Sequence, residues 1–218
     1  MTKSIVRNLK KFLFEFVIVT LGILTAFSIN KWDENEKLIV EEKKAYISFK
    51  KDLKLELYVL NYYKQSSIKG SNYLKPIIEE NYKDLDTLEH YLQIGFDLQE
   101  GNATYVNLKY SGKLGILKNQ DIKTHLILYY ETYYQGLEKI SKTNYDFLFN
   151  FLKPYFFKKV KYNYTREDIL NHLKESEFLN LIKSQNDMLE YNISIIEKSE
   201  NLINRIIKFL NKELQVEE

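Results

Sequence analysis

An apolar run close to the N-terminus constrains this chain more than any other feature of its sequence. The run extends from Phe12 to Ile29 and holds 18 residues, of which only Glu15 is ionisable. As an α-helix it would be about 27 Å long, which matches the hydrocarbon core of a bilayer. Trp32 follows where aromatic side chains favour the membrane–water interface. We therefore expect residues 12–32 to form a single transmembrane helix.

The net charge of +2 is unevenly distributed around this run. Residues 1–11 hold four basic side chains and no acid, whereas residues 30–218 are nearly neutral in sum. Because basic segments stay on the cytoplasmic side of a membrane, residues 1–11 are predicted to be a cytoplasmic tail. The same rule predicts that residues 33–218 form an extracytoplasmic domain.

Two other interpretations of the apolar run remain open. It could be a cleaved signal peptide, because Ala26 and Ser28 are small residues at the spacing of a cleavage site. It could also be a buried helix of a soluble protein, although the all-round apolar character and the step in charge disfavour that. With no cysteine in the chain, a lipid anchor on cysteine is excluded, and so is a disulfide framework.

Glu15 is the unusual residue of the run, because a carboxylate in hydrocarbon is costly and often functional. It lies about one turn inside the boundary, where it could reach the headgroups or pair with Lys11. Alternatively it bonds a partner helix or serves a proton path in a membrane-coupled machine. Gly22 and Ala26 form a small-xxx-small pair that would let another helix approach closely. Glu15, Gly22, Ala26 and Trp32 are therefore the candidate membrane or partner contacts.

Two stretches of sequence resemble a known family. One reads EFVIVTLGILTAFSINKWDE from Glu15 to Glu34, and the other reads LKYSGKLGILKN from Leu108 to Asn119. Both are similar to an uncharacterised bacterial membrane-anchored family, a domain of unknown function with an N-terminal E…GI…A…I-N-x-W-x-E helix. The resemblance covers about the first 35 residues well, the middle loosely and the rest hardly at all. It implies an inner-membrane anchor with a periplasmic helical domain, and it supplies no catalytic residue.

The remainder of the chain is predicted to be an all-α bundle, because Gly (7) and Pro (2) are too few for a turn-rich β fold. In residues 33–64 the apolar residues recur at helical spacing. They are Tyr46, Phe49, Leu53, Leu57 and Leu60. We expect a break at Ser66–Gly70, then a short helix around Pro76 and one over 85–96. Another short helix over 104–118 precedes a long helix that opens at Asn119 or Asp121 and is stopped by Pro154. Thr165 and Asp168 resemble a capping box.

The last predicted helix, over 176–214, has apolar residues every seven positions. They are Ile182, Leu189, Ile196, Ile203 and Leu210. The positions three residues further on are mostly polar, at Gln185, Asn192 and Ser199, so the pattern is broader than a strict coiled-coil seam. Packing in an intramolecular bundle is favoured, and a homodimer interface remains the alternative.

Few patterns point to chemistry. Three histidines each follow an aspartate by four residues, at Asp86/His90, Asp121/His125 and Asp168/His172. Such pairs could ligate a metal in a helical metalloenzyme, but an aspartate is also favoured near any helix start by the helix dipole. Tyr129, Tyr130, Tyr133 and Tyr134 could form a stacking platform, although bundle core is the commoner role.

The sequence therefore predicts no cofactor and no metal site. Near-zero net charge gives no signature of nucleic-acid binding. We expect a scaffold, accessory subunit or sensor that works through protein–protein contacts or self-association at a lipid bilayer.

Overall fold

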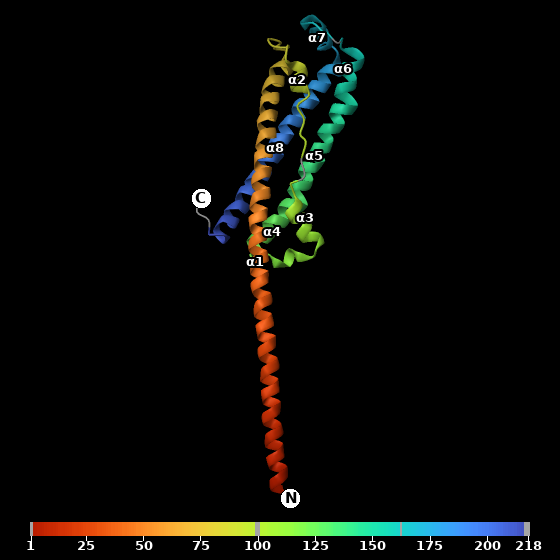
Figure 1. The fold of residues 1–218 in the computed structure, drawn as a ribbon. Helices are drawn as coiled ribbons and strands as arrows, with labels where there is room; N and C mark the ends of the chain where they lie inside the picture. The colour runs from red at the N-terminus through yellow and green to blue at the C-terminus, as the bar shows by residue number, and fades with distance from the viewer. Residues whose placement is uncertain (1, 99–100, 162, 216–218) are drawn as a thin grey trace. The chain divides into compact units, whose positions relative to one another are not determined.

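The computed structural model describes the backbone of residues 2–98, 101–161 and 163–215, and the side chains of these ranges from residue 14 onward. The described residues form helices and connecting segments with no strand, which confirms the all-α class (Figure 1). The chain divides into two compact units, residues 1–45 and 46–218, and helix α1 (Thr2–Ile78) contributes to both. The predicted basic side chains of the tail (Lys3, Arg7, Lys10 and Lys11) lie outside the described residues.

The second unit contains the end of α1 and a series of further helices. Short helices follow at α2 (Leu88–Leu92), α3 (Ala103–Tyr110) and the 3-10 turn η1 (Lys113–Ile116). A continuous helical run comes next, made of α4 (Gln120–Leu128), the π-helical turn η2 (Tyr129–Tyr133), α5 (Tyr134–Phe147), the π-helical turn η3 (Leu148–Leu152) and α6 (Lys153–Lys159). The chain closes with α7 (Arg166–His172) and α8 (Ser176–Glu213).

Within residues 46–218, the end of α1, the run from α4 to α6, and α8 lie side by side (Figure 1). Helix α1 is parallel to the continuous helical run from α4 to α6, because Tyr46 bonds Asn119 and Glu56 bonds Tyr129. Both are antiparallel to α8. There Ser71 bonds Asn186 while Lys64 bonds Glu200, and Asn144 bonds Asn192 while His125 packs on Phe209. Thus α8 is antiparallel to two helices that are parallel to each other.

The predicted break at Ser66–Gly70 is wrong, because α1 continues through it to Ile78. The small residues instead face α8. Ser67 and Ser71 are buried, and a Cβ at Gly70 would lie 2.7 Å from the Leu189 side chain. They therefore allow close helix packing. The expected separate helix around Pro76 is also absent, since Pro76 lies in the last turn of α1.

The predicted helix over 85–96 is mostly wrong, because only Leu88–Leu92 is helical. The chain then leaves the helix and passes between the long helices, where their side chains satisfy its backbone. Gln185 donates to the Ile94 carbonyl at 2.6 Å, and the Leu98 amide donates to Ser141 Oγ at 3.1 Å. Tertiary hydrogen bonds thus replace the helical ones that periodicity predicted.

Two predicted helix starts are confirmed, and one predicted stop is wrong. The Asn119 side chain accepts hydrogen bonds from the amides of Asp121 and Ile122, and Thr165 with Asp168 forms a full capping box. Pro154 does not end the long helix, since it occupies the first turn of α6. The π-helical turn directly before it changes the backbone pairing, which accommodates the ring and the missing N–H.

The α8 helix spans Ser176–Glu213, as predicted, and all five heptad residues are fully buried within the chain. The polar positions Gln185, Asn192 and Ser199 are buried as well. Asn192 exchanges two hydrogen bonds with Asn144, at 3.0 and 3.2 Å. Because a buried amide needs a specific partner, this pair fixes the register of α8 against α5. This face of α8 is thus used inside the bundle.

Candidate membrane anchor and polar groove

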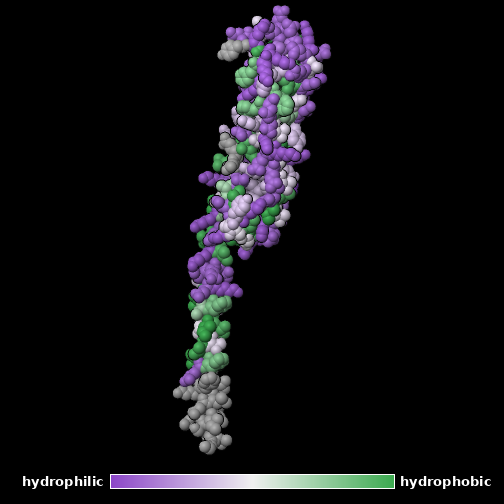
Figure 2. All heavy atoms as spheres, turned by 90° about the vertical axis from the view of Figure 1, so that its right-hand side faces the viewer, coloured by the Kyte–Doolittle hydropathy of each residue, from purple (hydrophilic) through white to green (hydrophobic). Residues whose placement is uncertain are grey.

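The segment of α1 from Phe14 to Trp32 is the candidate membrane anchor. Its described side chains include no buried residue, and its large apolar side chains are 49–67% exposed. Helix α1 is long and apolar enough in this segment to cross a membrane. Figure 2 shows the segment as a band of hydrophobic residues followed by hydrophilic ones. None of the apolar window is buried within the described chain, whereas the core helix of a soluble bundle is mostly buried.

The hydroxyl groups of the anchor have all their donors satisfied inside the helix. Thr20, Thr25 and Ser28 each donate to the carbonyl four residues earlier, at 2.8 Å. In hydrocarbon an unsatisfied hydroxyl would cost several kcal/mol, so this bonding makes the three residues compatible with lipid. The first ion pair of α1 after the anchor, Asp33 with Lys37 at 2.6 Å, lies past Trp32.

The four candidate contact residues lie on this segment. Glu15 is exposed, and its predicted partner Lys11 lies outside the described side chains. A Cβ at Gly22 would meet nothing within 4 Å, and Ala26 is exposed, so the small-residue face is open. Trp32 is 66% exposed. The functional roles predicted for these residues stay predictions.

A buried carboxylate is the feature of the body that the sequence interpretation missed. Glu56 is only 5% exposed and accepts a 2.5 Å hydrogen bond from the Tyr129 hydroxyl, while its other oxygen has no partner among the described residues. The pKa of Glu56 is raised to about 7, chiefly by burial; the hydrogen bond from Tyr129 lowers it and the nearby Asp52 charge raises it. Near neutral pH the group therefore exchanges between its protonated and ionised forms.

The signal for Glu56 was present in the spacing. Phe49, Leu53 and Leu60 are buried, and position 56 continues their stripe better than Leu57, which is only half-buried. A hydrophobicity pattern passes over a glutamate because glutamate is rarely buried.

The tyrosine cluster around η2 surrounds this carboxylate. Tyr129, Tyr130 and Tyr134 are buried, which confirms the core interpretation of these three, and Tyr133 is half-buried. The π-helical turn brings Tyr129 and Tyr134, five residues apart, to the same side, with ring centroids 6.4 Å apart. Tyr105 stacks on Tyr130 at 4.5 Å. These rings are therefore unavailable as a surface platform.

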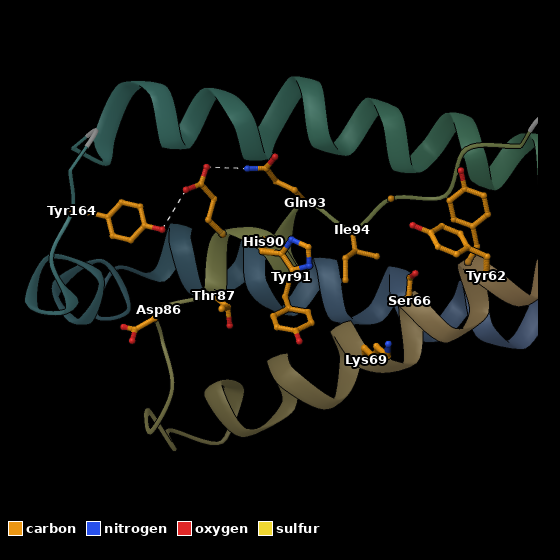
Figure 3. Close-up of a pocket in the computed structure, with 13 residues that line it drawn as sticks. Tyr62, Ser66, Lys69, Asp86, Thr87, His90, Tyr91, Gln93, Ile94 and Tyr164 are labelled. Carbon is orange, nitrogen blue, oxygen red and sulfur yellow. Dashed lines mark hydrogen bonds between the residues drawn. The ribbon is translucent and has the colours of Figure 1, made fainter.

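A polar groove of about 930 Å³ lies within the second unit (Figure 3). Helix α1 contributes Tyr62, Tyr63, Ser66 and Lys69. The segment around α2 contributes Asp86, Glu89, His90, Tyr91 and Gln93, and Tyr164 comes from the loop before α7. Figure 3 shows Tyr164 at one end and Tyr62 at the other, with His90 and Tyr91 between them. Aromatic rings and hydrogen-bonding groups thus share one concave surface.

Several side chains of this groove are held in place before any ligand binds. Glu89 accepts from Gln93 Nε2 at 2.9 Å and from the Tyr164 hydroxyl at 3.2 Å. The Tyr91 ring stacks on Tyr73 at 4.2 Å. Burial and the neighbouring Glu89 carboxylate raise the pKa of the Tyr164 hydroxyl. Tyr164 therefore stays protonated as a hydrogen-bond donor.

The three Asp/His pairs serve different local structures. Asp121 lies in the first turn of α4, and its carbonyl lies 2.7 Å from His125 Nδ1. Asp168 belongs to the capping box, while His172 contacts Tyr155 and Glu175. Only His90, with Asp86, lines the groove. Among the described residues no group of three or more His, Cys, Asp or Glu side chains is placed to hold a metal ion.

Comparison with protein-family models, curated proteins and solved structures gives no match to this chain. The structure therefore defines a helical protein with a candidate membrane anchor and a polar groove.

Proposed function

We propose that this chain is a single-pass membrane protein whose helical body acts through protein–protein interaction, as a scaffold, accessory subunit or sensor. The carrying observation is the anchor: an 18-residue apolar window of α1 has no buried residue, while residues 46–218 bury their own apolar faces. Apolar surface left in water is unfavourable by about 25 cal/mol per Å². A bilayer removes that surface from water along the whole segment.

The proposed topology follows the charge pattern. Residues 1–11 lie in the cytoplasm, the anchor crosses a bacterial inner membrane, and residues 33–218 lie in the periplasm. The resemblance of Glu15–Glu34 to the uncharacterised bacterial membrane-anchored family supports the same arrangement, and we place the chain with that family.

The test of topology is a pair of reporters fused after Glu218, expressed in bacteria. One reporter is active only in the periplasm and the other only in the cytoplasm. We expect activity of the first alone, and activity of the second alone would overturn the proposed orientation. The intact mass of the membrane-extracted protein separates an anchor from a signal peptide, since cleavage near Ser28 would remove the whole basic tail.

The test of the interaction role is crosslinking in native membranes. A photo-reactive residue at Gly22 or Ala26 probes neighbouring helices, and one at Leu24, on another face and 56% exposed, is the control. We expect a discrete protein adduct, including a dimer of this chain, from the small-residue face and only lipid adducts from Leu24. Lipid adducts at all three positions would contradict a helix partner in the membrane.

Glu15 supports a second candidate function, a subunit of a membrane-coupled machine. It is the one ionisable residue of the apolar run from Phe12 to Ile29, and such residues often mark functional contacts. Replacing Glu15 with Gln should then abolish function without lowering the protein level in the membrane. Normal function in this variant would remove the idea and leave the anchor proposal intact.

A further inference from the structure

We infer that the groove between α1, α2 and Tyr164 is a binding site for a neutral, linear oligosaccharide. The site lies entirely within residues 62–164, so the inference does not depend on the membrane proposal. It rests on the chemistry of the lining, on its rigidity and on its size.

The lining combines aromatic rings with polar groups of both hydrogen-bonding senses. Tyr62, Tyr91 and Tyr164 present rings or hydroxyls, and Gln93 and His90 present planar hydrogen-bonding groups. A sugar ring has a C–H face that packs on an aromatic ring and hydroxyls at its rim that both donate and accept. Aromatic side chains with a polar handle suit that combination because one end is apolar and the other is wet.

The charge of the groove selects against other polar ligands. Lys69 is opposed by two carboxylates, Asp86 and Glu89, so the lining carries more negative than positive charge. A phosphate-rich ligand or a nucleic acid would need an excess of basic residues. A purely apolar ligand is disfavoured too, because it would cover the exposed Gln93 and His90 side chains without offering them hydrogen bonds.

The fixed positions of the side chains favour binding. Glu89 already holds Gln93 and Tyr164 through hydrogen bonds. Tyr91 is held against Tyr73. A ligand therefore gains contacts with groups whose conformational freedom is already restricted, which lowers the entropic cost of binding.

The size of the groove indicates an oligomer. Its volume of about 930 Å³ lies at the upper end of the range of about 300–1,000 Å³ for ligand sites. A second hollow of about 550 Å³ shares Glu89 and Gln93 with it and is also lined by Phe149 and Phe157. A chain of several sugar units fills such a groove better than a single sugar does.

An extended proline-rich peptide is the rival ligand, since it also docks in aromatic-lined grooves. Prolines need apolar slots between aromatic rings. Here His90 lies between Tyr164 and Tyr62 (Figure 3), and Asp86 and Glu89 also line the groove, so its lining is more polar than such slots require. The observations therefore favour the saccharide.

The test is calorimetric titration of the full chain in detergent with tetramers of glucose and of N-acetylglucosamine, and with decaproline. Tyr62→Ala removes an exposed ring of the groove, and Tyr58→Ala removes another exposed ring one turn earlier on α1, outside the groove. Gln93→Ala removes an exposed polar group. Both tyrosines are more than 60% exposed, so neither substitution should unfold the bundle.

We expect at least one tetramer to bind in the micromolar to millimolar range. Tyr62→Ala and Gln93→Ala should each weaken that binding about tenfold, which corresponds to losing about 1.4 kcal/mol, while Tyr58→Ala leaves it unchanged. Absence of binding by both tetramers overturns the inference. So does binding that the groove variants do not weaken, and so does binding of decaproline alone with the same dependence on Tyr62.

Discussion

Replacing Glu56 with Gln should stabilise the bundle at neutral pH and leave it almost unchanged in acid. Glutamine has nearly the shape of a protonated glutamate and retains an oxygen that can accept the hydrogen bond from Tyr129. It cannot ionise. The variant therefore isolates what the charge of Glu56 contributes to stability at each pH.

The magnitude follows from the pKa of Glu56, which rises from 4.5 to about 7 on folding. A raised carboxyl pKa means that the folded state binds the proton more tightly than the unfolded state does. Stability from this group is thus complete below pH 4.5 and is lost as the pH rises through about 7. At about 1.4 kcal/mol per pKa unit the loss is about 3 kcal/mol.

The assay is urea unfolding of the full chain in detergent, followed by circular dichroism at several pH values between 4.5 and 8. The gap in the free energy of unfolding between Glu56→Gln and the natural chain should widen by about 3 kcal/mol over this range. Glu197→Gln, at an exposed position of α8, is the matched control and should give no widening. Parallel curves for Glu56→Gln and the natural chain would refute a buried, weakly acidic Glu56.

Further substitutions test the packing and the helix caps of the bundle. Gly70→Val should destabilise the bundle by about 1–3 kcal/mol, because even a Cβ there would lie 2.7 Å from a buried leucine side chain. Gly136→Ala should stabilise it by up to about 1 kcal/mol, because a Cβ at this helical position would meet nothing within 4 Å. Urea unfolding measures both changes. Asn192→Ala should lower the free energy of unfolding by about 1–3 kcal/mol, because it leaves the buried Asn144 amide without its partner. Replacing both Asn144 and Asn192 with Leu should lower it by less, and a double-mutant cycle measures the difference. Thr165→Ala removes the capping box and should cost about 1 kcal/mol, with faster amide exchange confined to α7.

The helical class and the long helices could be predicted because each depends on local pattern. The stripe Tyr46, Phe49, Leu53 and Leu60 is buried, and the bounds of α8 agree with its heptads. The caps at Asn119 and Thr165 depend on residues within one turn, which is why they too could be recognised.

The errors arise where a distant contact overrides the local preference. Ser66–Gly70 looks like a turn by composition, yet its small residues are needed because α8 passes close to them. Pro154 looks like a stop, yet a π-helical turn absorbs it. The first error thus comes from a distant helix, and the second from the backbone conformation directly before Pro154. The choice between bundle and homodimer also depends on a distant contact, because the partner of Asn192 is 48 positions away.

The candidate groove exists because the chain departs from its sequence pattern after Leu92. Periodicity favours a helix over 85–96, and a helix there would hydrogen-bond its own backbone along its length. Instead Gln185 donates a hydrogen bond to the Ile94 carbonyl, and the Leu98 amide donates one to Ser141 Oγ. The segment therefore continues between the long helices without forming a helix. The groove opens at this transition, with His90, Tyr91 and Gln93 at the end of α2 facing Tyr62 and Lys69 of α1. Natural proteins tend to break local rules at functional sites. The bonds that hold Ile94 and Leu98 out of a helix are therefore the part of the fold most directly connected with the proposed binding of a ligand.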